Sequence, residues 1–296
     1  MGFSSQDALV NAITTLGQTW IQPWNKNALP TTAQVQGQWY DLFNGAGNPA
    51  ASTILGTGTN LTFQALTDAT TNASGIMHGG AVSTATKHIL NASAYSAALT
   101  TAPCILMLVD MLAFFPITTV TTTGAQTLLG TQTLPRYANG KGVQAYLVPS
   151  TIMGAGTPTC QLSYTNPSST SGRLTPTTLP TLNATAPVGS IPYSGTGAGK
   201  YGPFMPLAAG DNGILSTQTI NFNATMTSGV MNLVLCKPLL TLPITTVGVA
   251  AERDLVNQLP SLPQVYDGAC LNWLMYAGAN TPVNSAFYGQ IQFGWN

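Results

Sequence analysis

CILMLVDMLAFFPI, residues 104–117, is the most apolar run of the chain and the stretch that decides its fold. The run is shorter than the roughly 20 residues that a membrane-spanning helix needs, and it carries Asp110 at its centre. Short apolar runs bounded by turn signals are typical of strands buried in a core. We therefore predict a buried strand here and no membrane span.

Similar strand patterns lie on both sides of this run along the chain. The turn TSG joins the segments 213–226 and 230–244, which predicts a hairpin. The other strand segments, bounded by Gly, Pro, Thr or Asn, are 143–149, 160–165, 268–278 and 285–295. The fold class that follows is mainly β: an antiparallel β-sandwich, with a jelly roll as one version, and a few short helices.

The last strand segment shows its two faces in the sequence. Successive side chains of a strand point to opposite sides of the sheet. One face of this segment therefore carries Phe287, Gly289, Ile291 and Phe293, and the other carries Tyr288, Gln290 and Gln292.

Three segments favour helix. Residues 1–30 have an amphipathic pattern that ends at Pro23, which predicts an N-terminal arm or helix docked on a neighbour. Residues 80–101 are dominated by alanine and predict an interior helix. AERDLVNQL, residues 251–259, has the periodicity of a short helix.

This short helix begins with three of the chain's few charges. Glu252, Arg253 and Asp254 are expected at its solvated or interface end, where first-turn polarity is favourable. An inter-subunit salt-bridge cluster and a ligand site are the alternatives for these three residues.

The predicted organisation has four parts. Residues 1–30 form the N-terminal arm or helix, and 31–165 form a β-rich region with one interior helix. Residues 166–200, rich in Pro, Ser, Thr and Gly, form an extended loop that lies across a partner or links two halves. Residues 201–296 form a C-terminal β region, which joins 31–165 in one domain or stands apart.

Charge is scarce in this chain. Charged residues make up 5% of its 296 residues, against about a quarter in ordinary soluble proteins. Thr, Ser, Asn, Gln and Gly supply the polarity instead, and the formal net charge is zero. Because a surface with so little charge promotes self-association, we expect copies of the chain or other partners to cover much of it.

The same scarcity bears on other partner classes. The eight Lys and Arg residues are scattered and form no basic stripe, so we expect no direct contact with nucleic acid. The N-terminal sequence lacks the basic and apolar regions of a signal peptide, so we expect no export by the general route.

No catalytic pattern stands out. The two histidines, His78 and His88, accompany no nucleophile motif and are expected to be structural or surface residues. Asp211 and Asp267 precede turn glycines, which explains them as turn residues. The glycine-rich stretch GTGAGK, residues 195–200, lacks the spacing of a phosphate-binding loop. We therefore predict no enzyme and no cofactor.

Cysteine spacing favours no metal site. The four cysteines stand far apart with no CxxC pair, and they are expected to be buried free thiols, with disulfides as the alternative. They are Cys104, Cys160, Cys236 and Cys270.

The aromatic residues of the first 40 positions complete the set of candidate interface residues. Trp20, Trp24, Trp39 and Tyr40 are expected as core or interface anchors, and the alternative is that they stack on sugar rings. With Glu252, Arg253 and Asp254 they are the residues that the sequence singles out for binding.

The composition and one long stretch resemble a known class of proteins. GDNGILSTQTINFNATMTSGVMNLVLCKPLLTLPI, followed by AERDLVNQLPSLPQVYDGACLNWL, resembles structural proteins of tailed bacteriophages, over residues 210–296. The resemblance implies a capsid protein on the virion surface, made in the host cytoplasm, with copies of itself, as a trimer in one version, and a major capsid protein as partners.

Within that class, the sequence favours a decoration (cement) or accessory shell subunit. A major capsid protein of the tailed-phage type usually carries a long charged spine helix, and no segment here predicts one. A receptor-binding or carbohydrate-binding attachment protein is the first alternative, and a major capsid subunit is the second.

Overall fold

The computed structural model describes residues 3–29, 33–68, 75–82, 84–98, 101–176, 181–195, 198–200, 202–258 and 262–296. The chain is mainly β, as predicted, and every pairing between its strands is antiparallel. Its elements in chain order are α1 (Gln6–Thr14), β1 (Thr19–Asn27), β2 (Trp39–Asp41), the 3-10 helix η1 (Leu42–Asn44), β3 (Gly47–Asn48), β4 (Gln64–Ala65), β5 (Lys87–Ser96), β6 (Cys104–Ile117), β7 (Gly124–Thr127), β8 (Gln144–Pro149), β9 (Cys160–Thr165), β10 (Arg173–Leu174), β11 (Ser216–Phe222), β12 (Met231–Ile244), β13 (Ala251–Asp254), α2 (Leu255–Gln258), β14 (Gln264–Val265), β15 (Leu271–Ala277) and β16 (Ala286–Trp295).

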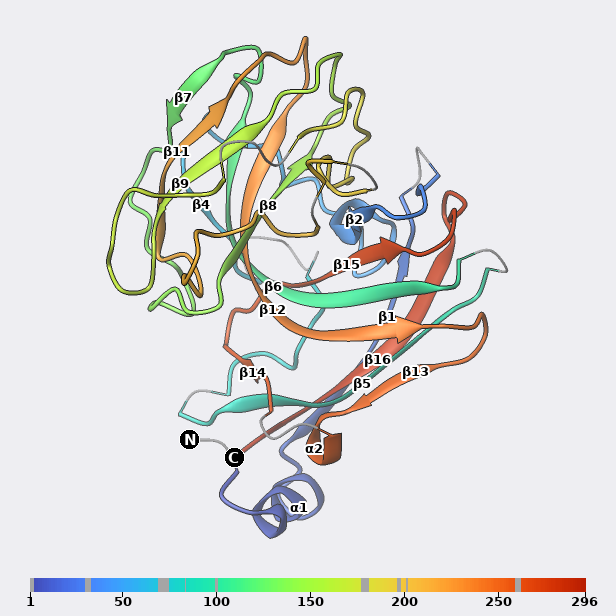
Figure 1. The fold of residues 1–296 in the computed structure, drawn as a ribbon. Helices are drawn as coiled ribbons and strands as arrows, with labels where there is room; N and C mark the ends of the chain where they lie inside the picture. Colours follow the sequence, from blue (N-terminus) through green and yellow to red (C-terminus); the bar gives the residue numbers. More distant parts are fainter. Residues whose placement is uncertain are drawn as a thin grey trace.

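These strands form three sheets (Figure 1). The upper sheet has the order β10-β9-β11-β7. The central sheet has the order β2-β15-β6-β12-β8, with β4 also paired to β6. The lower sheet has the order β13-β5-β16-β1-β3, with β14 also paired to β5.

Two long strands of the central sheet connect the two halves of the molecule. β6 and β12 pair along their whole length, from Met231 opposite Ile117 to Ile244 opposite Cys104. The pairing shifts register at two places, and such bulges bend a strand. In Figure 1 both strands curve from the upper sheet down to the lower one. One curved pair of strands therefore supplies a wall to two cores.

Each core lies between the central sheet and one outer sheet. The upper core joins Leu162 and Phe222 of the upper sheet to Phe115 and Leu233 of the central sheet. The lower core joins residues of the lower sheet to the other ends of β6, β12 and β15. It includes Trp24, Phe287, Ile291, Leu106, Leu242 and Trp273. The arrangement is sandwich-like in both halves.

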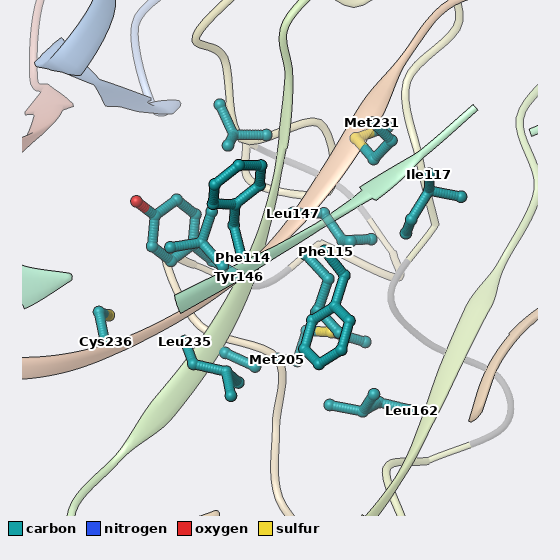
Figure 2. Packing of buried hydrophobic residues seen from close by; sticks show 14 of the residues in the cluster. Phe114, Phe115, Ile117, Tyr146, Leu147, Leu162, Met205, Met231, Leu235 and Cys236 are labelled. Carbon is teal, nitrogen blue, oxygen red and sulfur yellow. The ribbon is translucent and has the colours of Figure 1, made fainter. Parts of the chain in front are cut away.

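Strand β6 explains the apolar run at residues 104–117. Its first residues alternate between buried and half-buried, whereas both faces are buried from Leu108 onward. Figure 2 shows the rings of Phe114 and Phe115 on opposite sides of the strand, with Tyr146 on the side of Phe114. A strand covered on both faces needs a continuous apolar sequence, and the prediction of a buried strand is confirmed.

The predicted interior helix at 80–101 is wrong, because the segment contains strand β5. Ala92 and Ala94 point into the lower core, while Asn91, Ser93 and Tyr95 alternate with them on the outer side. β5 pairs with β16 on one side and with β13 and β14 on the other. Alanine prefers a helix by only roughly 0.5 kcal/mol per residue. Strand pairing along both sides of β5 outweighs this preference.

The predicted hairpin between 213–226 and 230–244 is also wrong. Both segments are strands, but β11 pairs with β7 and β9 in the upper sheet, whereas β12 pairs with β6 and β8 in the central sheet. The TSG turn therefore moves the chain from one layer to the next. Nothing in the local sequence distinguishes such a crossing from a hairpin.

The N-terminal segment is only partly helical. α1 ends at Thr14, and Gly17 follows with a φ of 65° that favours glycine. From Thr19 the chain enters the lower sheet as β1, between β16 and β3, so residues 1–30 are not a free arm. Pro23, predicted to end a helix, pairs with Gln290 at a position where β1 has only β16 beside it.

Strands from the predicted parts 1–30, 31–165 and 201–296 lie in shared sheets. The central sheet combines β6 and β8 with β12 and β15, and the lower sheet combines β5 with β16. The described residues of the segment 166–200 include strand β10 and contribute to the upper core. Its residues in that core are Leu182, Ala186, Ile191 and Tyr193.

Candidate functional site

The placement of the charged residues is the first feature that bears on function. The chain has eight basic and eight acidic residues, and five of them are buried. The buried ones are Lys26, Asp41, Lys87, Asp110 and Arg136. A buried charge costs free energy unless hydrogen bonds or an opposite charge compensate it, so each needs a structural account.

Asp110 and Arg136 compensate each other. The Arg136 guanidinium donates from Nε to Oδ2 at 2.8 Å and from Nη2 to Oδ1 at 2.7 Å, and Nη2 also donates to the carbonyl of Met111. The backbone N–H of Cys270 donates to Asp110 Oδ1 at 3.0 Å. Burial raises the pKa of Asp110, and the Arg136 guanidinium opposes that shift. The pair fixes the segment around Arg136 against the centre of β6.

Asp41 forms a second buried network. Its carboxylate accepts from Tyr146 Oη at 2.7 Å, from Asn272 Nδ2 at 2.6 Å and from the backbone N–H of Phe43 at 2.8 Å. Burial raises the pKa of Asp41. These bonds connect β2, β8 and β15, three strands of the central sheet. Their arrangement is that of a structural network.

Lys26 is buried beside this network. Its ammonium donates to the carbonyls of Gly45 and Ala50, at 3.0 and 3.2 Å. Burial lowers its pKa to about 8. The side chain therefore attaches the segment after β2 to strand β1.

The two histidines also have structural positions. His78 Nδ1 lies 2.9 Å from Lys87 Nζ and accepts from this ammonium. Burial and the charge of Lys87 lower the pKa of His78 to about 4. His88 Nδ1 lies 3.2 Å from the carbonyl of Leu262, which is close to β14. Both rings are buried, so the expectation of structural histidines is met.

Few charges remain on the surface of 11606 Å². In the described part of the chain, five charged side chains are exposed, namely Asp7, Asp68, Lys141, Glu252 and Asp267. Wide areas of the surface are therefore polar without being charged.

The outer face of the lower sheet is an ordered example. We use this name for nine residues on β1, β16 and β5 that alternate with the core residues of these strands. Cross-strand register aligns them in three rows of three, none of them charged. The rows are Ile21–Gln292–Asn91, Pro23–Gln290–Ser93 and Asn25–Tyr288–Tyr95.

An aromatic pair lies in this face. The rings of Tyr95 and Tyr288 stack with their centroids 5.5 Å apart and their planes at 23°. Both side chains are exposed, at 39% and 38%. Tyrosine on a flat amide-rich face gives a surface that can bind another protein without charge pairs.

The three charges at 252–254 lie at the edge of the same sheet. Glu252 accepts from Asn91 Nδ2 at 2.5 Å, and Arg253 Nε donates to the carbonyl of Thr241 at 3.1 Å. Asp254 Oδ1 accepts from the backbone N–H groups of Val256 and Asn257 and so caps α2. The residues form strand β13 before this four-residue helix, not its first turn.

This position explains why charges gather here. β13 is an edge strand of the lower sheet, and charged side chains on an edge hinder the addition of a further strand. All three residues have partners within the chain, which accounts for them without a ligand.

The candidate aromatic residues divide between core and surface. Trp24 and Tyr40, expected as core or interface anchors, are both buried in the lower core. Trp24 packs on Trp273 with ring centroids 4.9 Å apart. Trp39 is half-buried against Tyr276, and Trp20 is 42% exposed.

Sequence reasoning missed most of the outer face. The alternation of Tyr288, Gln290 and Gln292 was visible, but the matching alternation of Asn91, Ser93 and Tyr95 was hidden in a segment that reads as helix. Only the pairing of β5 with β16 brings the two sets together.

The cysteines and acids form no recognisable metal site. All four cysteines are buried and free, as predicted, and burial raises the pKa of Cys104 to about 12. In the described ranges, no group of three or more His, Cys, Asp or Glu residues is placed to hold a metal ion. Over the same ranges, no helix has the length and apolar character to cross a membrane.

No protein-family model matches the chain, and a search of curated proteins found no match.

Proposed function

We propose that this chain is a non-enzymatic structural protein of a virus particle. Its role is that of a capsid decoration (cement) or accessory shell subunit, which stabilises the head through uncharged contacts with copies of itself and with a major capsid protein. The observation that carries the proposal is the placement of charge, because a chain poor in charged residues buries five of them.

The outer face of the lower sheet supports this proposal. A free protein with a broad uncharged surface tends to associate, whereas a subunit of an assembly covers that surface permanently. Asn, Gln, Ser and Tyr side chains on a rigid sheet can form hydrogen bonds with a neighbour, and such contacts depend little on salt. These properties fit a subunit that holds a shell together.

The helices favour an accessory subunit over a major capsid subunit. α1 has nine residues and α2 has four, and the described chain contains no long charged helix of the kind that a tailed-phage major capsid protein usually carries. Both the upper and the lower core are formed by residues of this one chain. A folded subunit that adds to an existing shell fits both observations.

Size-exclusion chromatography with light scattering tests the proposal. We expect a closed oligomer whose mass is the same at about 50 mM and at about 500 mM NaCl, because uncharged contacts are not screened by salt. A monodisperse monomer at both salt concentrations would contradict self-assembly and would favour the alternative of an attachment protein.

A pair of variants locates the contact. Gln290→Lys places a charge in the middle of the outer face and should shift the oligomer to monomer. Thr127→Lys places the same charge on an exposed position of β7 in the upper sheet and should leave the oligomer intact. Equal behaviour of the two variants would show that the outer face is not the contact.

A further inference from the structure

A small polar pocket lies beside strand β14, away from the outer face of the lower sheet. Its volume is about 210 Å³, and its lining includes Lys87, Arg136, Gln264, Tyr266 and Asp267. Pockets for drug-sized ligands have volumes of about 300–1,000 Å³. The size therefore suits a single small ring.

Arg136 lines this pocket and has an unused donor. Its side chain is only 3% exposed, and Nε and Nη2 are occupied by Asp110 and by the carbonyl of Met111. The third nitrogen, Nη1, has no hydrogen-bond partner among the described residues, and it is not sealed from solvent. Because Arg136 is rigidly paired with Asp110, the two N–H groups of Nη1 point in a fixed direction. This lowers the entropic cost of binding an acceptor.

Lys87 and Asp267 give the pocket a second polar pair. Lys87 Nζ is buried, bonds to His78 Nδ1 and to the carbonyl of Gly80, and lies 3.8 Å from Asp267 Oδ1. Asp267 is exposed and also accepts from the backbone N–H of Val82. The pocket thus offers an acceptor as well as donors.

The charges around the pocket are balanced. Arg136 is matched by Asp110, and Lys87 is matched by Asp267. A full anion would gain little here, because each cation already has its carboxylate. A ligand without net charge, whose own groups both donate and accept, satisfies the site better.

Two uncharged side chains complete the lining. Tyr266 is 36% exposed, and its ring is held edge to face against Tyr137 with centroids 4.8 Å apart. The side-chain amide of Gln264 makes no hydrogen bond with a described residue and has one donor and one acceptor group free. An aromatic face beside amide, guanidinium and carboxylate groups is suited to a ring with several hydroxyl groups.

We propose that this pocket binds one uncharged sugar ring, either a free monosaccharide or one unit of a neutral glycan. Hydroxyl groups of the ring accept from Arg136 Nη1 and from the side-chain amide of Gln264 and donate to Asp267, while the ring stacks on Tyr266. The proposal does not depend on the assembly role, because the pocket and the outer face share no residue.

The test uses the full chain and saturation-transfer difference NMR. The probes are four neutral sugars (glucose, galactose, mannose and N-acetylglucosamine), with glucuronate and inorganic phosphate for comparison. We expect at least one neutral sugar to bind with a dissociation constant on the order of 1 mM, with the same affinity at about 50 mM and about 500 mM NaCl.

Matched variants assign the binding to the pocket. Tyr266→Ala and Gln264→Ala should each weaken binding at least about tenfold, or about 1.4 kcal/mol, and Tyr266→Phe should retain it because the ring remains. Tyr288→Ala and Gln290→Ala on the outer face should leave the affinity unchanged, and each variant is checked for an unchanged melting temperature.

Three results would overturn the proposal. The first is that none of the neutral sugars binds. The second is that glucuronate or phosphate binds more tightly and loses affinity in salt, which would make this an anion site. The third is that the outer-face variants lose binding while the pocket variants keep it, which would place the sugar on the outer face.

Discussion

Arg136 binds both carboxylate oxygens of Asp110, at 2.8 and 2.7 Å, at the middle of the most apolar strand of the chain. The pair joins a loop to the centre of β6, where the upper and lower cores meet. The two side chains form a bidentate charge-assisted pair. Such a pair fixes their relative orientation and also forms stronger hydrogen bonds than uncharged groups do.

Removing one partner of this pair should strongly destabilise the protein. Arg136→Met leaves the Asp110 carboxylate buried without its cation, and we expect the free energy of unfolding to fall by about 3–5 kcal/mol. The double variant Asp110→Leu with Arg136→Met should recover most of that loss, because no unpaired charge remains. Urea unfolding measures both, and equal losses in the two variants would contradict this account.

Acid should destabilise the protein through His78. The pKa of His78 is about 4 in the fold, below its usual 6.5, so the unfolded chain binds more protons between these values. Neutral His78 therefore adds about 3 kcal/mol to the free energy of unfolding above about pH 6.5. This contribution is lost as the pH falls from 6.5 toward 4.

Urea unfolding at a series of pH values measures this effect. His78→Gln supplies an amide oxygen that can accept from Lys87 but does not titrate, so the slope of stability against pH should become smaller between pH 6.5 and 4. A slope identical to that of the unmodified protein would show that other groups cause the acid sensitivity.

The charges of β13 should protect the edge of the lower sheet. Replacing Glu252 and Arg253 with valine removes two charges from an exposed edge and should increase aggregation on mild heating, measured by turbidity. Asn221→Val is the control, because it adds a similar apolar group to β11, a strand with neighbours on both sides and outside the outer face. Similar turbidity in both variants would mean that hydrophobicity alone causes the aggregation.

The two cores should unfold together. β6 and β12 contribute to both, so damage to either core weakens the same strands. Leu162→Ala in the upper core should lower the free energy of unfolding by about 2–5 kcal/mol and Phe287→Ala in the lower core by about 3–5 kcal/mol.

Tryptophan fluorescence and circular dichroism follow this unfolding with separate probes. Trp24 and Trp273 lie in the lower core and Trp39 packs against the upper core, so tryptophan fluorescence reports both halves. We expect the two methods to give one coincident transition in each variant. Two separate transitions would show that the halves fold independently.

Strand positions were the most predictable feature of the fold. β6, β8, β9 and β16 lie where apolar runs or strict alternation indicate strands, because burial of one or both faces directly shapes the sequence. β5 was not predictable in this way, since its Ala and Ser residues are equally compatible with a helix. Its identity depends on neighbours that are distant in the sequence.

The candidate site was less predictable for the same reason. The scarcity of charge is visible in the composition, but the burial of Lys26, Asp41 and Asp110 is not. The outer face requires β1, β5 and β16 to lie side by side, and the sugar pocket requires Arg136 to lie beside Tyr266.

By itself, the sequence determined that the chain is a charge-poor β protein with buried thiols and an apolar central strand, because composition and alternation follow from burial. The tertiary structure alone decided which strands pair, and thus that β11 and β12 separate into two sheets and that one strand pair serves two cores. The physical reason is that pairing partners are selected by packing and by backbone hydrogen bonds between distant segments, which leave no local signal.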